Sequence, residues 1–266
     1  MESSQTKETY MNTIFEALHD IELSSKSASL CTVVKTSGST PRHSTSKMLV
    51  YSDGSINGTI GGGELENQVI LEAKLCLKNR SSRLIEYNMT DPSRGDVGIC
   101  GGQVMVFIEP IQPAPLIIII GGGHVGKAVA HLAKWLGFRT AISDDRLELC
   151  TKEANPDADF FFPVEMRYLP DNVQIDEQTY LILTTRGVSV DIEGLPFLLK
   201  TNAGFIGVIG SKRRWAETVK QLTSQGIPLE EFSKIHSPIG LEIYAETPEE
   251  IAVSIMAEIV MVHRKS

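Results

Sequence analysis

Cysteine is scarce in this chain of 266 residues, and its four cysteines are far apart in the sequence. They form no C-x-x-C pair and have none of the spacings that hold zinc, which excludes a zinc site built from thiols. A disulfide framework is not expected in a cytosolic chain of this size. We interpret Cys31 in an apolar strand, and Cys76 and Cys150 on helix-like stretches, as core residues.

Hydrophobic runs of membrane-spanning length are also missing. The apolar run Leu116–Ile120 is far shorter than the roughly 20 residues that a spanning helix needs. Residues 1–6 lack the basic start and the apolar core of a signal peptide. The sequence therefore predicts a cytoplasmic protein.

A surplus of positive charge is lacking too, because the formal net charge is −8 at pH 7. A negative chain is repelled by nucleic acid and by anionic membrane surfaces, so we expect neither as a partner. What is present is an ordinary globular composition, 42% hydrophobic and 22% charged. The length suggests about two domains.

Prolines mark the boundary between the two predicted domains. Residues 110–115, with the sequence PIQPAP, cannot continue a helix or a central strand and are typical of a stiff linker. We therefore predict one domain over residues 1–112 and a second over residues 113–266. In the first, helical periodicity and alternating patterns predict an α+β domain. Its expected helices cover residues 11–21 and 64–79, and its expected strands cover 30–35, 47–52, a segment ending at 60, 83–89 and 104–109.

The second domain alternates strands and helices, which is typical of an α/β fold with a Rossmann-like, doubly wound parallel sheet. Apolar runs predict its strands at residues 116–120, 138–143, 159–163, 180–185 and 205–209. Thr247, Pro248 and Glu250 form a capping box, which predicts the start of a last helix.

A glycine-rich turn carries the clearest functional signal. Gly121, Gly123 and Gly126 follow an apolar strand and match the G-x-G-x-x-G pattern of dinucleotide sites. Glycines let a pyrophosphate approach the next helix, whose free N–H groups favour an anion. Asp144 ends the second strand, where an acid meets a ribose hydroxyl. His124 either contacts a ligand or faces solvent. A Rossmann-like scaffold that no longer binds a nucleotide is the alternative.

Two turns with basic residues are further candidates for anion binding. The hydroxyl-rich turn with Arg42 either holds a phosphate or carboxylate or is a surface turn. Ser211 is a predicted N-cap, and it is followed by three cations that begin with Lys212. Cations oppose the dipole at a helix start, so a bound anion would relieve them. The alternative is a solvated basic turn.

Two glycine-rich loops lie in the first domain. Residues 61–63 come between a strand and a helix, where an anion can bind, but Glu64 and Glu66 would repel it, so a tight turn is the alternative. Cys100 has glycines on both sides of its loop. They leave room at the sulfur and expose N–H groups that stabilise a thiolate. Cys100 is therefore either a reactive thiol or a small hydrophobic residue.

Taken in order, these segments resemble the XdhC/CoxI family of xanthine dehydrogenase accessory proteins. The matching segments are residues 38–42, 47–50, 58–66, 100–102, 121–126, 144–146, 207–213, 237–241 and 246–255. The chain departs from the family pattern at a few positions. Thr45 and Ser46 stand where a Gly-Ala pair is expected, and Ile99 stands where Met is common. Tyr244 stands where glycine is frequent, and its side chain would narrow a pocket.

The resemblance implies a chaperone rather than a hydroxylase. It implies binding of the molybdenum cofactor (molybdopterin), support of its sulfuration, and insertion into the apo-enzyme of a molybdenum hydroxylase. It makes Cys100 the expected cofactor or sulfur contact. It makes Gly121, Gly123, Gly126 and Asp144 the expected nucleotide-type site. A homodimer is expected, and a cysteine desulfurase is a further expected partner.

Two other functions stay open from the residues alone. An NAD(P)-dependent oxidoreductase would use the glycine turn, but it needs an acid or base beside the nicotinamide, and only His124 and His236 lie near the motifs. A nucleotide-sensing module without turnover is the other. No His/Cys cluster suits a metal, so molybdenum is expected to arrive with its pterin.

Overall fold

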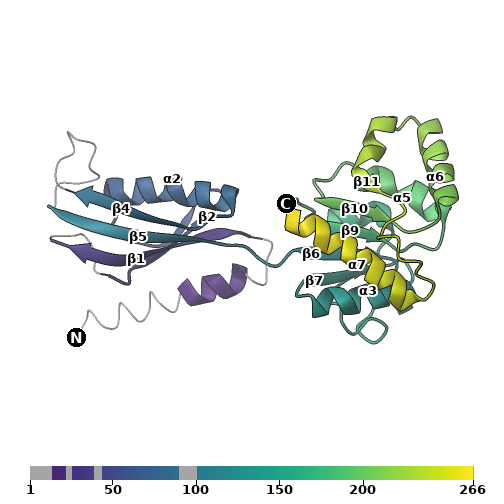
Figure 1. The fold of residues 1–266 in the computed structure, drawn as a ribbon, viewed down its shortest axis with the longest axis horizontal. Helices are drawn as coiled ribbons and strands as arrows, with labels where there is room; N and C mark the ends of the chain where they lie inside the picture. Colours follow the sequence, from purple (N-terminus) through teal and green to yellow (C-terminus); the bar gives the residue numbers. More distant parts are fainter. Residues whose placement is uncertain (1–13, 22–25, 39–43, 90–100, 266) are drawn as a thin grey trace. The chain divides into compact units, whose positions relative to one another are not determined.

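A computed structural model describes residues 14–21, 26–38, 44–89 and 101–265. By its internal contacts the chain divides into two compact units, Met1–Pro113 and Ala114–Ser266. The division falls within the proline-rich segment. Each unit has its own sheet and its own core (Figure 1).

The first unit is built on a five-stranded antiparallel sheet with the strand order β3-β2-β1-β5-β4. Its elements are β1 (Ala28–Ser37), β2 (Lys47–Tyr51), β3 (Ile56–Gly58), α2 (Gly63–Asn79), β4 (Arg83–Met89) and β5 (Gly102–Ile111), and residues 14–21 are helical. This arrangement confirms the predicted α+β character.

Helices cover both faces of this sheet because its strands alternate between two apolar clusters. Cys31 and Val33 of β1 point to one cluster, where α2 buries Leu65 and Val69. Ala28 belongs to the other cluster, which is completed by the helical residues 14–21. Figure 1 shows the two helices on opposite sides of the sheet.

The second unit is a parallel sheet of six strands in the order β11-β10-β9-β6-β7-β8. Its strands are β6 (Leu116–Ile120), β7 (Arg139–Ser143), β8 (Phe160–Phe162), β9 (Thr179–Leu183), β10 (Phe205–Val208) and β11 (Ile235–His236). Its helices are α3 (His124–Trp135), η2 (Leu147–Leu149), η3 (Met166–Tyr168), α4 (Leu169–Asn172), α5 (Val188–Leu198), α6 (Lys212–Ser224), η4 (Leu229–Lys234) and α7 (Pro248–Lys265).

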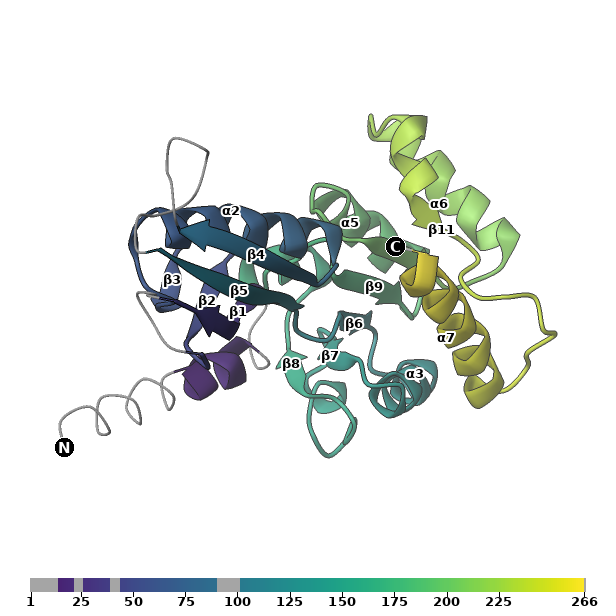
Figure 2. The ribbon, with the colours of Figure 1, turned by 60° about the vertical axis from the view of Figure 1, so that its left-hand side comes forward.

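Alternate residues of the central strand β6 face opposite sides of this sheet. Ile117 and Ile119 pack with α3 and α7, whereas Ile118 and Ile120 pack on the side of α5 and α6. Figure 2 shows these two helix layers with the sheet between them. Burial on both faces explains the unbroken apolar run of β6. The predicted doubly wound α/β fold is confirmed.

Local details of the second unit differ in part from the prediction. The two-residue strand β11 was not predicted, because it is too short to show a pattern. Cys150 follows the short 3-10 turn η2 and is not on a regular helix. The capping box of α7 is confirmed, since Glu250 N donates to Thr247 Oγ1 at 3.2 Å and Thr247 N donates to the Glu250 carboxylate at 3.0 Å.

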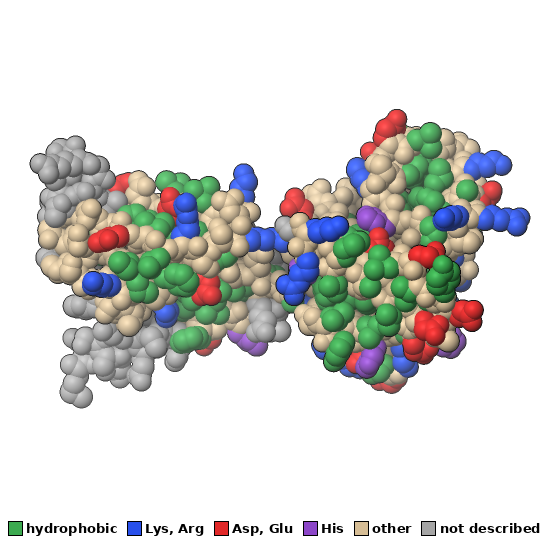
Figure 3. Space-filling view, in the orientation of Figure 1, with side chains coloured by type: hydrophobic (Ala, Val, Ile, Leu, Met, Phe, Trp, Pro, Cys, Tyr) green, Lys and Arg blue, Asp and Glu red, His purple; other side chains and the backbone are tan. Residues whose placement is uncertain are grey.

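The outer faces of the described elements are mixed in character. In the described part of the chain no helix is long and apolar enough to cross a membrane. Figure 3 shows hydrophobic side chains gathered over α7, with acidic and basic groups around them. Val253 and Met261 are among the exposed apolar side chains of this helix. The apolar stripe of α7 therefore extends beyond the part that the core covers.

Candidate functional site

The turn between β6 and α3 has room for glycine only at two of its three motif positions. Gly121 has a φ of +117°, and a side chain there would come within 2.6 Å of the Thr184 carbonyl oxygen. A side chain at Gly126 would collide with the Gly121 carbonyl oxygen. These two glycines hold strand and helix together, which is the structural half of the dinucleotide pattern.

Gly123, the middle glycine of the motif, faces open space. A side chain there would meet nothing within 4 Å. It is the N-cap of α3, and no side chain caps this helix start. The first N–H groups of α3 are therefore available to an anion, and the helix dipole favours one. His124, the first residue of α3, is exposed beside this space.

Asp144 holds the glycine turn from inside the protein. Its carboxylate is 2% exposed. It accepts a hydrogen bond from Gly122 N at 2.8 Å and from Arg146 N, Nε and Nη2 at 2.8–3.0 Å. These four bonds use about all the acceptor positions of a carboxylate. The ribose contact stays a prediction, and a ribose hydroxyl would have to displace part of the Arg146 guanidinium.

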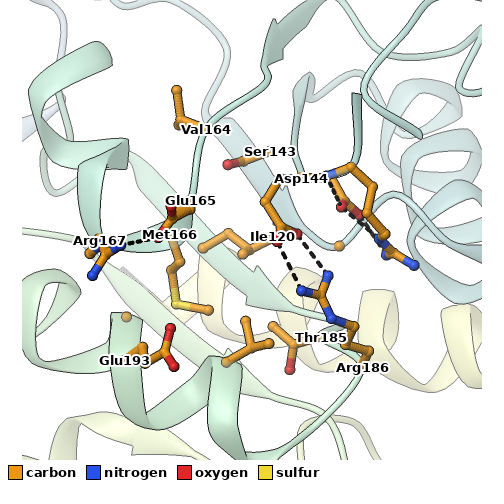
Figure 4. Close-up of a pocket in the computed structure, with 15 residues that line it drawn as sticks. Ile120, Ser143, Asp144, Val164, Glu165, Met166, Arg167, Thr185, Arg186 and Glu193 are labelled. Atoms are coloured by element: carbon orange, nitrogen blue, oxygen red, sulfur yellow. Dashed lines mark hydrogen bonds and ion pairs between the residues drawn. The ribbon is translucent and has the colours of Figure 1, made fainter. Parts of the chain in front are cut away.

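A cavity of about 200 Å³ opens at the carboxyl ends of β6, β7 and β9 (Figure 4). The chain runs outward from β6 in both directions of the sheet, so this is the point where ligands bind in open α/β sheets. The cavity is lined by Ile120, Gly121, Ser143, Asp144, Asp145, Arg146, Val164, Glu165, Met166, Arg167, Thr185, Arg186, Val190, Glu193 and Gly194. Gly121 belongs both to this wall and to the glycine turn, so cavity and turn are continuous.

An ion pair joins two strand ends beside this cavity. Asp145 accepts two hydrogen bonds from the Arg186 guanidinium, at 2.7 and 2.8 Å. These bonds lower the pKa of Asp145 and raise that of Arg186, in both cases chiefly through the hydrogen bonds themselves. Both side chains are partly exposed, so the pair contributes little to stability. It fixes the positions of the loops after β7 and β9.

One polar atom in the cavity wall has no partner. Ser143 is fully buried at the end of β7, and its Oγ makes no hydrogen bond to the described residues. Buried hydroxyls are normally hydrogen-bonded. A ligand or a water in the cavity would satisfy this one, and a ligand is the simpler reason for a serine here.

The basic turn before α6 has a different explanation from the predicted one. Ser211 is the N-cap, as predicted, and accepts from Arg214 N at 3.2 Å. The Arg214 guanidinium donates to Asp191 at 2.7 Å and to Thr185 Oγ1 at 2.7 Å. A fully buried carboxylate thus relieves one of the three cations, which corrects the expectation that a bound anion does so. Lys212 remains exposed at the helix start.

The glycine triplet of the first unit is a tight turn closed by its own acid. The Glu66 carboxylate accepts from Ile60 N and Gly62 N, both at 3.2 Å, and from Thr59 Oγ1 at 2.6 Å. An internal carboxylate therefore takes the place of a bound anion. The sequence signal for this was Glu66 itself, in the first turn of α2.

The predicted segments of the first unit leave the sheet at the same end. Their flanking residues are paired there, Ser37 with Gln103, Met89 with Gly102, and Met48 with Gly58. The backbones of Gly38 and Gly101 are in close contact, because a side chain at Gly38 would lie 2.9 Å from the Gly101 carbonyl oxygen. Arg42 and Cys100 themselves lie outside the described residues.

The other three cysteines are core residues, as predicted. Cys31, Cys76 and Cys150 are all at most 6% exposed. Burial raises the pKa of Cys31 to about 12 and also raises the pKa of Cys76 and of Cys150. Thiols in this state are poor nucleophiles and poor metal ligands. Among the described residues no group of three or more His, Cys, Asp or Glu could hold a metal ion.

Two family models match the sequence. The model described as the XdhC Rossmann domain matches residues 117–259, which is more than half of the chain. The model of the XdhC and CoxI family matches residues 24–88. Each match falls within one of the two compact units.

Three curated proteins are similar to the chain. The uncharacterized protein YqeB of Escherichia coli K12 is 37% identical over 86% of this chain and 42% of its own length. A probable xanthine dehydrogenase subunit of Bacillus subtilis 168 is 33% identical over 60% and 46%. The molybdenum cofactor insertion chaperone PaoD of E. coli K12 is 23% identical over 90% and 85%. The chain thus spans less than half the length of the first two.

A solved structure has the same fold. It is a crystal structure of a xanthine dehydrogenase from Bacillus halodurans, 22% identical, with a TM-score of 0.52 over 94% of this chain and 95% of that one. Fold, glycine turn and family models agree with the resemblance of the sequence motifs. The chain belongs to the XdhC and CoxI family.

Proposed function

We propose that this chain is an accessory protein that binds the molybdenum cofactor, supports its sulfuration and inserts it into a molybdenum hydroxylase of the xanthine dehydrogenase type. Membership of the XdhC and CoxI family supports this proposal. So do the names of two relatives, a molybdenum cofactor insertion chaperone and a probable xanthine dehydrogenase subunit.

The observation that carries the proposal is the open space at Gly123, before the uncapped N–H groups of α3. Molybdopterin ends in a phosphate, which suits a helix start of this kind. The fit extends to the cavity beside the turn, where Ser143 Oγ has no partner among the described residues. Bound cofactor would supply molybdenum with its own sulfur ligands, and the chain would contribute the phosphate and ring contacts.

The first unit is proposed to hold the sulfur chemistry. Cys100 and Arg42 follow described strand ends that meet at one end of the sheet. A thiol there would contact the cofactor or its exchangeable sulfur. A cysteine desulfurase as sulfur donor, a homodimer and a cytoplasmic location belong to the same proposal.

Replacing Cys100 by serine is expected to lower bound pterin by about tenfold, as loss of a group next to a metal commonly does. The fold should persist. The matched control is Cys31→Ser, which puts a hydroxyl in a fully buried site. It is expected to cost about 1–3 kcal/mol of stability and leave binding intact. Pterin fluorescence and thermal melts of both variants measure this. Normal binding and delivery by Cys100→Ser would make that cysteine structural.

The proposal is tested by purifying the chain from cells that make molybdopterin. Oxidation converts bound cofactor to a fluorescent pterin, which is expected to elute with the protein. The purified chain is expected to show no xanthine-dependent turnover. Turnover by the chain alone, or hydride transfer from NAD(P)H to a carbonyl compound, would favour an oxidoreductase instead.

A further inference from the structure

The cavity at the sheet edge is too small for a whole dinucleotide. Its volume of about 200 Å³ is below the roughly 300–1,000 Å³ of sites that enclose drug-sized ligands. Ile120, Met166 and Val190 supply apolar wall, and Met166 reaches it because Gly194 leaves room on α5. Apolar walls around so small a space suit one flat ring system.

The charges of the cavity wall select the ring's hydrogen-bonding groups. The lining holds four carboxylates and three guanidiniums. Each guanidinium is paired with a carboxylate, Arg146 with Asp144, Arg167 with Glu165, and Arg186 with Asp145. This leaves Glu193, an excess of one negative charge. A phosphate is therefore disfavoured inside the cavity, and a neutral ring that presents N–H donors is favoured.

Glu193 is placed to receive such donors. It extends from α5 toward the space below Met166 (Figure 4). Among the described residues it makes no hydrogen bond and no ion pair at contact distance. A carboxylate binds best to two parallel N–H groups, one for each oxygen. The 2-amino-4-oxopyrimidine edge provides this pair, and it is common to guanine and to pterins. Adenine lacks it.

We propose that this cavity binds a 2-amino-4-oxopyrimidine ring, with its N–H and amino group on Glu193 and an attached phosphate at the start of α3. This inference rests on the proposed function, since it names the part of the cofactor that the second unit reads. Two observations independent of the helix start support it, the unpartnered hydroxyl of buried Ser143 in the wall and the unpaired acid. Gly121 joins both parts of the site.

The test is equilibrium binding to the full chain by calorimetry, with GMP, AMP, 6-hydroxymethylpterin phosphate and inorganic phosphate as probes. GMP is expected to bind at least about tenfold more tightly than AMP, the effect of one charged hydrogen-bond pair. The variant Glu193→Gln should lose this preference and keep its affinity for inorganic phosphate. Glu148→Gln, an exposed acid outside the cavity lining, is the matched control and should behave as wild type.

The outcomes separate the two ring sources and the two proposals. Tighter binding of the pterin phosphate than of GMP supports a pterin, and the reverse supports a guanine nucleotide. Equal affinity for GMP and AMP in the wild-type chain overturns the inference. If Glu193→Gln keeps as much cellular pterin as wild type, the inference fails and the chaperone function stands. If GMP selectivity depends on Glu193 and no pterin is retained from cells, the inference stands and the chaperone function fails.

Discussion

Replacing Gly126 by alanine is expected to lower the free energy of unfolding by more than about 3 kcal/mol, beyond ordinary overpacking. The added methyl group would collide with the Gly121 carbonyl oxygen, and it would lie 3.0 Å from Thr184 Oγ1. Neither group can move freely, because Thr184 Oγ1 is bonded to the same carbonyl at 2.7 Å. Denaturant unfolding followed by circular dichroism measures the change.

Gly123→Ala is the matched control for this experiment, since it adds the same methyl group at a position where it meets no neighbouring atom. Its φ is −74°, and the space around it is open. Its stability is expected to stay within about 1 kcal/mol of wild type. Equal destabilisation by both variants would show that strand and helix do not pack as closely as the structure has them.

Replacing Gly123 by valine is expected to abolish cofactor retention while the fold persists. The branched side chain would occupy the space before the N–H groups of α3. Loss of two charged hydrogen bonds to a phosphate, each worth about 1.5–3 kcal/mol, lowers affinity by roughly a hundredfold or more. The measurement is pterin fluorescence of the purified variant, with circular dichroism as the check on folding.

Wild-type pterin content in a folded Gly123→Val protein would contradict a phosphate at this helix start. The site would then have to lie elsewhere in the chain. The end of the first unit's sheet, from which the Cys100 loop departs, is the next candidate.

Strand and helix patterns made the fold predictable from the sequence. The apolar run of β6 and the glycines after it identify the first strand and the turn of a doubly wound sheet without any long-range information. Elements below about four residues, such as β11, carry too little pattern to be found. The alternation of Ile117 and Ile118 between two cores was implied only by the fold itself.

The site was predictable only where its residues are neighbours in the sequence. Gly121, Gly123 and Gly126 form a local motif. The cavity instead combines residues after β7, β8 and β9 with α5, and no spacing rule links Ser143 to Glu193. The pairing of Arg214 with Asp191 was hidden for the same reason.

Two departures from the family pattern have a backbone explanation. Thr45 has a φ of 81° and Tyr244 a φ of 57°, both in the left-handed region that glycine adopts with least strain. The glycines expected at these places therefore fit the backbone. Tyr244 is 88% exposed and does not line the cavity, so the interpretation that it narrows a pocket finds no support there.

Transfer of cofactor tests the central claim most directly. The chain, purified with bound pterin, is mixed with the cofactor-free form of a molybdenum hydroxylase, and substrate oxidation by the mixture is followed. The account predicts that activity rises in proportion to the pterin carried by the chain, and that Gly123→Val protein restores none. Equal activation by wild type and by Gly123→Val, or no activation by a chain that carries pterin, would contradict it.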